Sequence, residues 1–194
     1  MNNNLLTYKQ EVYRKIHHLS SLFIPLIMYY LSESKSLLFI SGCLFLALLI
    51  DFGRNRVSFI KTIFNYTLKP VTRIYETNFL SASYMIISFF LITLFFETNI
   101  IITAMILSIV ADTTAALFGM KIGKVKLFFN KTLEGSYIFF LTSYLILYFS
   151  NIHLSNFHMI IIAFLTMFVE LLSPTKFDNF TLPIATSLII YFVL

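Results

Sequence analysis

The sequence predicts an all-α fold, a single domain over residues 1–194 in which a bundle of helices crosses a lipid bilayer. Two observations lead to this class. The 194-residue chain is 58% hydrophobic, with 23 phenylalanines, and only 12% of its residues are charged, whereas a soluble domain carries about 25% charged residues. Its mean hydropathy is +0.85, and the apolar residues form runs separated by polar segments. We therefore expect lipid to surround the helices.

Seven apolar runs define the predicted helices, at residues 16–31, 37–50, 82–96, 100–119, 137–149, 157–172 and 182–194. Several are shorter than the about 20 residues that a helix perpendicular to the membrane needs. Flanking polar residues are therefore expected to belong to the same helices, or the bilayer to thin around the bundle. The first run lacks a small-residue cleavage site after it, so we expect it to be retained as the first span.

The basic residues predict how these spans are oriented. If the N-terminus is cytosolic, 13 of the 14 Lys and Arg residues lie in cytosolic segments and only Lys35 lies outside, which is the bias of short loops in membrane proteins. Seven spans then place the C-terminus outside. The acidic residues favour the same side, with only Glu33 and Glu97 outside. The excess of Lys and Arg in cytosolic loops does not require acidic residues to lie there too. The gathering of acids with bases at one face therefore indicates a site.

This distribution explains the net charge of +5 without a nucleic-acid partner, and the sequence indicates no protein partner. The one cysteine, Cys43, lies inside an apolar run. It excludes an intrachain disulfide and offers no thiolate cluster for a metal ion.

The longest polar connection, residues 51–80, predicts a basic amphipathic helix that lies on the membrane surface. Its basic residues alternate with the apolar residues Phe59, Ile60, Ile63 and Phe64. Two opposite-charge pairs, Asp51 with Arg54 and Arg73 with Glu76, are each spaced by one helical turn. Each is either an interfacial ion pair, which stabilises little, or part of a site that it faces.

Four polar residues near the N-terminus share one helical face, because their spacing follows the helical period. They are Glu11, Arg14, Lys15 and His18. A carboxylate, two cations and an imidazole on one stripe suit the binding of phosphate. The alternative is an intrahelical salt bridge followed by an interfacial histidine.

The centre of the chain predicts the core of a site. Asp112 lies at the end of an apolar run, where a carboxylate is costly unless a lysine or a metal ion compensates it. Gly119 and Gly123 follow at helical spacing. They let backbone N–H groups approach a phosphate, or they pack two helices together. They do not form a Walker A loop, because Val125 follows Lys124 and the glycine spacing is one residue short.

A polar turn opens the fifth run. Lys131 is the predicted phosphate contact, with Thr132 beside it, and Glu134 is expected to bind a metal ion or to orient a lysine. Gly135 and Ser136 begin the next helix, where free N–H groups can bind an anion.

Another pair of candidate ligands precedes the last run. Asp178 and Asn179 offer hard oxygen ligands that suit Mg²⁺, or they form an Asx-type turn that caps the last helix. Glu170 lies just before Ser173-Pro174, which is expected to end the sixth helix.

The chain resembles the family of CTP-dependent lipid kinases that includes dolichol kinase, phytol kinase and the yeast-type diacylglycerol kinase, and that is related to phosphatidate cytidylyltransferase. The matching motifs are Glu11-x-x-Arg14-Lys15-x-x-His18, Arg73-x-x-Glu76, Asp112-x-x-Ala115-x-x-x-Gly119-x-x-x-Gly123, Lys131-Thr132-x-Glu134-Gly135-Ser136 and Asp178-Asn179-x-x-x-Pro183. They cover nearly the whole chain in the family's order. The resemblance implies a polytopic bundle, CTP as phosphoryl donor, a divalent metal ion and a membrane lipid alcohol as acceptor.

The expected reaction is transfer of the γ-phosphoryl group of CTP to a polyprenol, a phytol-like alcohol or diacylglycerol, with Mg²⁺ as cofactor. Positioning and charge neutralisation carry most of such catalysis. The expected metal ligands are Asp112, Glu134, Asp178 and Asn179. The expected nucleotide and phosphate contacts are Arg14, Lys15, His18, Arg73, Gly119, Gly123, Lys124, Lys131, Thr132, Gly135 and Ser136. A carboxylate, Asp178 rather than Glu170, is expected to accept the proton of the lipid hydroxyl.

Two other functions stay open. Phosphatidate cytidylyltransferases share the central element and would transfer CMP, but their C-terminal His-Gly-Gly and Asp-Arg pieces are absent from residues 170–183. A transporter or membrane scaffold would carry polar residues near the bilayer midplane on several spans, whereas the charges here lie at one edge. The short chain and compact loops suit an integral protein of the bacterial inner membrane, or of the endoplasmic reticulum in a eukaryote.

Overall fold

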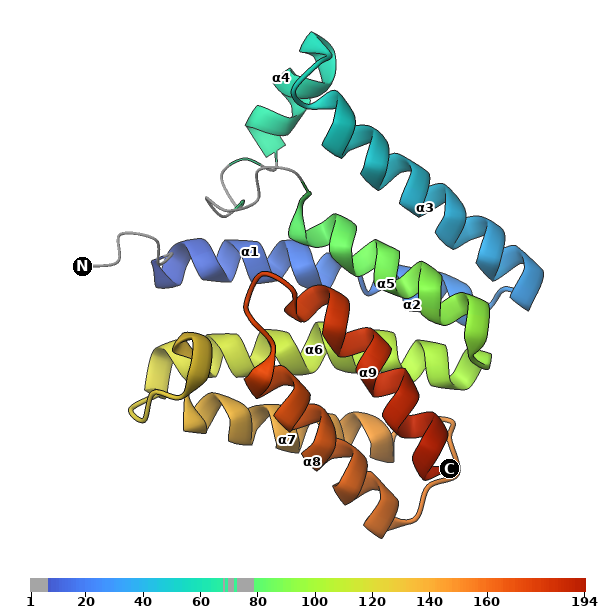
Figure 1. Ribbon diagram of the computed structural model, residues 1–194, viewed down its shortest axis with the longest axis vertical. Helices are drawn as coiled ribbons and strands as arrows, with labels where there is room; N and C mark the ends of the chain where they lie inside the picture. Colours follow the sequence, from blue (N-terminus) through green and yellow to red (C-terminus); the bar gives the residue numbers. More distant parts are fainter. Residues whose placement is uncertain (1–6, 68, 70–71, 73–78) are drawn as a thin grey trace.

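The computed structural model describes residues 7–67, 69, 72 and 79–194, and within these residues the chain is built from helices (Figure 1). The helices are α1 Tyr8–Ser20, α2 Phe23–Tyr29, α3 Glu33–Gly53, α4 Ser58–Thr67, α5 Ser81–Phe95, α6 Thr98–Ile122, the 3₁₀ turn η2 Phe128–Asn130, α7 Leu133–Tyr148, α8 Asn156–Leu172 and α9 Asp178–Val193. The predicted all-α class is confirmed. The last five apolar runs correspond to α5 to α9; flanking residues lengthen α6, α7, α8 and α9 as expected, while α5 keeps the length of its run.

The prediction of one continuous helix over the first apolar run, residues 16–31, was wrong. The chain forms two helices there, and α1 begins at Tyr8, well before the run. Thr7 caps α1 with a capping box, because its side chain accepts from the Gln10 N–H and Gln10 bonds back to the Thr7 backbone. Pro25 lies in the first turn of α2, where its missing N–H costs nothing but where it could not continue α1.

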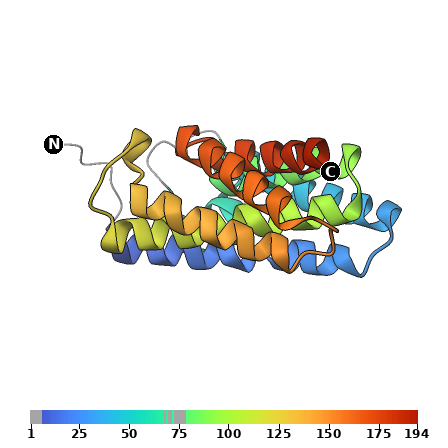
Figure 2. The same ribbon diagram turned by 90° about the horizontal axis from the view of Figure 1, so that it is seen from below.

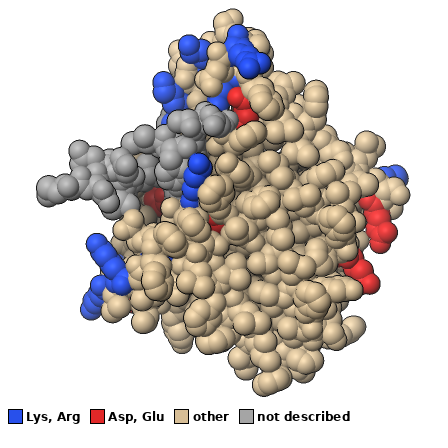
Figure 3. All heavy atoms as spheres, in the orientation of Figure 1, with Lys and Arg blue, Asp and Glu red and all other residues tan. Residues whose placement is uncertain are grey.

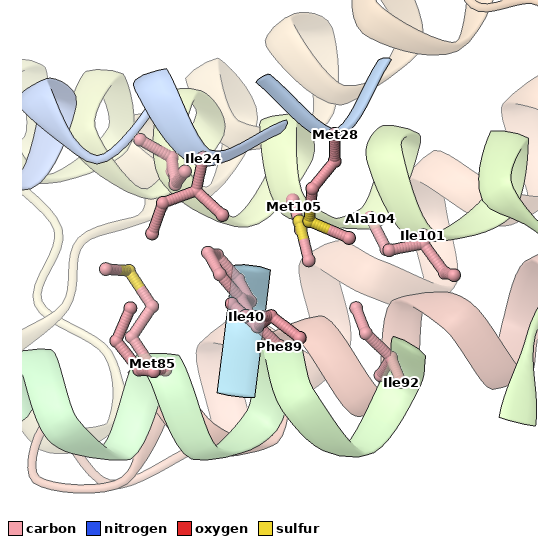
Figure 4. Close-up of a cluster of buried hydrophobic side chains, with 11 residues drawn as sticks. Ile24, Met28, Ile40, Met85, Phe89, Ile92, Ile101, Ala104 and Met105 are labelled. Atoms are coloured by element: carbon pink, nitrogen blue, oxygen red, sulfur yellow. The ribbon is translucent and has the colours of Figure 1, made fainter. Parts of the chain in front are cut away.

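Helix α6 is the centre of the bundle and packs against α1, α2, α5, α7 and α9 (Figures 1 and 2). One apolar core joins it to α2, α3 and α5, as Figure 4 shows for Met28, Ile40, Phe89 and Met105. A second core joins it to α7, α8 and α9. Because both apolar cores include residues of α6, this helix positions the site described below.

Two of the described helices, α3 and α6, are long and apolar enough to cross a membrane by length and composition alone. The most apolar stretch of α6 is 67% buried inside the protein, whereas that of α3 is 22% buried. Helices α5, α7, α8 and α9 are apolar but shorter. Helix α3 therefore offers most of its side chains to the surroundings, and α6 offers few.

The segments that carry most of the basic residues lie at one end of the bundle. This charged end comprises the start of α1, the end of α3, α4, the end of α6, the η2 loop, the start of α7, the end of α8 and the start of α9 (Figure 1). Lys and Arg side chains gather there, toward the left and top of Figure 3, while the broad central surface is almost free of charge. The short connections make successive helices alternate in direction, so every second connection returns to this end.

Within the predicted segment 51–80 the described residues form one separate helix, α4, which covers Ser58–Thr67. It contacts α3 through Ile60, whose Cδ1 lies against Gly53, while Phe59 is 70% exposed and Tyr66 is 83% exposed. The predicted Asp51–Arg54 pair forms, with Arg54 Nε 3.9 Å from Asp51 Oδ1. Arg73 and Glu76 lie outside the described residues.

Glycines let α6 and α7 approach each other around one threonine. A methyl group on Gly119 would lie 2.8 Å from Thr132 Oγ1, and one on Gly135 would lie 3.0 Å from the Ala115 carbonyl oxygen. Thr132 cannot easily move away, because its hydroxyl accepts from the Gly135 N–H and caps α7. The glycine stripe therefore packs helices, which was one of its two predicted roles.

We expect Gly119→Ala to lower the free energy of unfolding by about 1–3 kcal/mol, because the added methyl group overpacks the Thr132 cap. Gly42→Ala is the matched control, since Gly42 lies in α3 and a methyl group there would meet nothing within 4 Å. That change should raise the stability by about 0.5–1 kcal/mol through helix propensity. Unfolding of the two purified variants, followed by circular dichroism, tests this; an equal gain for both would contradict the packing role.

Candidate functional site

The candidate site is built around an ion pair between α1 and α6. Lys15 Nζ lies 2.5 Å from Asp112 Oδ2 and also donates to the Asp112 carbonyl oxygen at 3.3 Å. The Lys15 residue is only 1% exposed and Asp112 is 5% exposed. His18 Nε2 lies 3.5 Å from the same carboxylate oxygen. A lysine from the predicted N-terminal stripe thus compensates the buried carboxylate.

A second ion pair lies one helical turn away on α1. Arg14 binds the Glu11 carboxylate through two nitrogens, at 2.5 and 3.0 Å. The Glu11 carboxylate supplies the counter-charge of the guanidinium, whose side chain is 11% exposed. The guanidinium therefore stays charged although it is mostly buried.

Asp178, at the start of α9, belongs to the same cluster. Its charge acts on both Arg14 and Lys15, and the residue is buried. Its Oδ1 accepts from the Asn179 N–H at 2.8 Å, which is a local turn contact. Asn179 turns elsewhere, because its side-chain amide donates to the Ser81 carbonyl oxygen at 3.3 Å. Asp178 therefore joins the site, while Asn179 ties α9 to α5.

Lys131 and Glu170 form a third pair, which sequence reasoning did not predict. Lys131 Nζ lies 2.9 Å from Glu170 Oε1 and also donates to the Glu170 carbonyl oxygen. Glu170 is 6% exposed, and the charges of Asp112 and Asp178 reach it. The sequence signal for a buried pair was the acid in the last turn of the apolar helix α8. Its partner could not be predicted, because Lys131 lies 39 residues away in the sequence.

We name these residues the charged cluster. It brings together four segments distant in the sequence: α1, α6, the loop before α7 and the α8–α9 junction. Its members are Glu11, Arg14, Lys15, His18, Asp112, Lys131, Glu170 and Asp178. Chemically, its cations can neutralise an anionic substrate, and its carboxylates can hold a cation or accept a proton.

The remaining predicted residues lie beside the cluster. Glu134 Oε2 accepts from the Val125 N–H at 3.4 Å, and backbone N–H groups of Glu134, Lys124 and Val125 lower the pKa of its carboxyl group. Lys124 is exposed. Ser136 is buried, and its hydroxyl has no hydrogen-bond partner among the described residues. Glu134 and Lys124 thus shape a surface loop.

The predicted Mg²⁺ site can be compared with these positions. Within the described residues, no three His, Cys, Asp or Glu side chains lie close enough together to hold a metal ion by themselves. Mg²⁺ often binds through one or two carboxylates and completes its shell with substrate phosphates and water. Asp112 and Asp178 are the two buried carboxylates among the predicted ligands and would supply that pair, whereas Asn179 donates to Ser81 and Glu134 accepts from the Val125 N–H.

A cavity of about 400 Å³ lies away from the charged cluster. Its lining comes from the end of α2, the start of α6 and the end of α7, and includes Tyr29, Asn99, Ile106 and Phe149. It therefore opens toward the opposite end of the bundle and holds none of the predicted site residues.

Comparison with known proteins does not assign a function to the chain. No family model matches the chain, and no solved structure matches it. The chain is similar to an uncharacterized protein of Rickettsia prowazekii, with 28% identity over 137 residues, which are 69% of this chain and 67% of that protein.

Breaking the central pair should be costly. We expect Lys15→Met to lower the free energy of unfolding by about 3–5 kcal/mol, because it leaves the buried Asp112 carboxylate without its counter-charge. The double variant Lys15→Met/Asp112→Asn removes that charge and should recover much of the loss. Lys9→Met, at an exposed position on the same helix, should change stability by less than about 0.5 kcal/mol. Additive effects of the two substitutions in a double-mutant cycle would contradict the pairing.

Proposed function

We propose that this protein is an integral membrane enzyme that phosphorylates a membrane lipid alcohol, with CTP as donor, at the cytosolic face. The observation that carries the proposal is the charged cluster, in which basic and acidic side chains from distant segments are buried at one end of an apolar helical bundle. A charge group of this kind is costly beside hydrocarbon and is characteristic of a functional site. The resemblance to CTP-dependent lipid kinases supplies the donor and the acceptor class.

The reaction would join the lipid hydroxyl oxygen to the γ-phosphorus while the bond from that phosphorus to the β–γ bridging oxygen breaks. The products are CDP and the lipid phosphate. Arg14, Lys15 and Lys131 would bind phosphate oxygens and balance the charge of the transferred group. Asp178 would accept the proton of the hydroxyl. Mg²⁺, held by Asp112 and Asp178, would supply further charge neutralisation.

The apolar sides of the bundle support a membrane location. Large exposed apolar side chains occur along α3, α7 and α9, among them Phe45, Tyr148 and Phe192. In water such a surface would aggregate, whereas in lipid it is the expected exterior. The proposed arrangement has seven spans, with α1 and α2 together forming the first, the N-terminus in the cytosol and α4 on the membrane surface.

The proposed orientation predicts which positions an impermeant thiol reagent reaches in intact bacterial cells. In a Cys43→Ser background, Lys35→Cys should be labelled from outside, and Lys61→Cys only after the cells are broken. Both side chains are exposed; Lys35 belongs to the first turn of α3 and Lys61 to α4, and these segments lie at opposite ends of the bundle (Figure 1). Labelling of Lys61→Cys in intact cells would contradict the orientation.

The proposed reaction is tested with purified protein, a panel of lipid alcohols, and CTP or ATP labelled at the γ position. Label should pass from CTP to one lipid class. If no alcohol acquires label from either nucleotide, the kinase proposal fails. Release of pyrophosphate with formation of CDP-diacylglycerol from phosphatidate would show the cytidylyltransferase reaction instead.

Within that assay, Lys131→Ala should lower turnover by about 10²-fold or more, because a positioned cation is lost from the transferring phosphoryl group. Asp112→Asn should be similarly inactive while keeping its helical circular dichroism spectrum. Lys35→Ala is the matched control, since Lys35 lies at the opposite end of the bundle. Turnover of Lys131→Ala at the rate of Lys35→Ala would refute the role of Lys131.

A further inference from the structure

The loop between α6 and α7 carries two aromatic side chains that the proposed reaction does not use. At its tip, Phe128 is 61% exposed and Phe129 is 48% exposed. Lys124 and Lys126 in the same loop are also exposed. An aromatic pair beside exposed lysines is an unusual surface to leave in water.

The loop holds these two side chains in a defined place. Its two sides are joined by an isolated antiparallel bridge between Lys126 and Thr132, and the Leu127 N–H donates to the Lys131 carbonyl oxygen at 2.7 Å. Phe129 and Asn130 adopt left-handed backbone conformations, with φ of 52° and 65°, which non-glycine residues seldom adopt. The tip is therefore a fixed turn rather than an open coil.

The base of the loop is tied to the rest of the bundle. Lys131 bonds to Glu170 at the end of α8, and Thr132 is wedged between α6 and α7. The two phenylalanines thus stand at a constant position relative to the charged cluster.

We propose that this loop tip inserts Phe128 and Phe129 into the headgroup region of the bilayer, at an anionic lipid surface. Aromatic side chains favour the membrane interface, where an apolar ring can leave water without entering the hydrocarbon core. Lysines next to it are attracted by anionic headgroups. Lys124 and Lys126 then bind lipid headgroups rather than the nucleotide. The insertion holds the charged cluster beside the membrane surface.

This inference rests on the membrane location proposed above, so the experiment tests the two separately. The chain has no Trp, and a single Trp is therefore an unambiguous probe. Phe128→Trp reports on the loop tip. Phe45→Trp reports on the middle of α3, where Phe45 is 67% exposed. Each full-length variant is reconstituted into vesicles of phosphatidylcholine with or without phosphatidylglycerol, using lipids brominated near the headgroup or near the chain end.

Fluorescence of Phe128→Trp should be quenched by bromine near the headgroup, and more strongly when phosphatidylglycerol is present. Adding Lys124→Glu and Lys126→Glu should lower that quenching severalfold. Phe129→Trp gives the same readout if Phe128→Trp does not fold. Phe45→Trp should be quenched by bromine near the chain end.

The outcomes separate the two proposals. If Phe45→Trp is quenched and neither loop variant is, the inserted tip is overturned while the membrane location stands. If Phe45→Trp is not quenched, the membrane location itself fails. Quenching of the loop variants that does not depend on phosphatidylglycerol overturns the anionic preference. A change in Phe128→Trp emission on adding CTP in detergent would assign the loop to the nucleotide and overturn the proposal.

Discussion

The burial of Asp112 is the constraint on which the rest of the structure depends. Asp112 lies on α6, the helix that both apolar cores share, and a carboxylate there needs a counter-charge. Lys15 supplies it, and because the Lys15 side chain must reach 2.5 Å from the carboxylate, the rotation and height of α1 against α6 are both set. The other polar residues of α1 are thereby turned toward the same place, since they share its helical face.

A second constraint fixes the far side of the charged cluster. The glycines of α6 and α7 let the two helices approach closely and leave the space that Thr132 occupies between them. That contact places Lys131, the residue before it, where it can bond to Glu170 on α8. Helix α8 then leads directly to Asp178 at the start of α9. Two ion pairs and one small-residue contact are thus sufficient to bring four distant segments to one end of the bundle.

The sequence predicted most of the helices, because long apolar runs bounded by polar residues have few other solutions. It missed the start of α1, where polar residues form a helix that a capping box begins at Thr7. It placed Lys15 and Asp112 in one site and required a lysine or a metal ion beside Asp112. It could not choose between them, or pair Lys131 with Glu170, because such choices depend on helix packing across 97 and 39 residues.

The charge balance of the cluster bears on what it can bind. Among the described residues, its three cations are paired with Glu11, Asp112 and Glu170, and Asp178 adds a fourth carboxylate whose charge reaches Arg14 and Lys15. A bare triphosphate would have to displace carboxylates from these cations and would meet their negative charge. A triphosphate that arrives with a divalent cation avoids this conflict, because the carboxylates that it releases become ligands of that cation. The carboxylates would then balance the cations of the empty site and bind the divalent cation when the nucleotide is present. This double use accounts for so many acids in a site proposed for an anion.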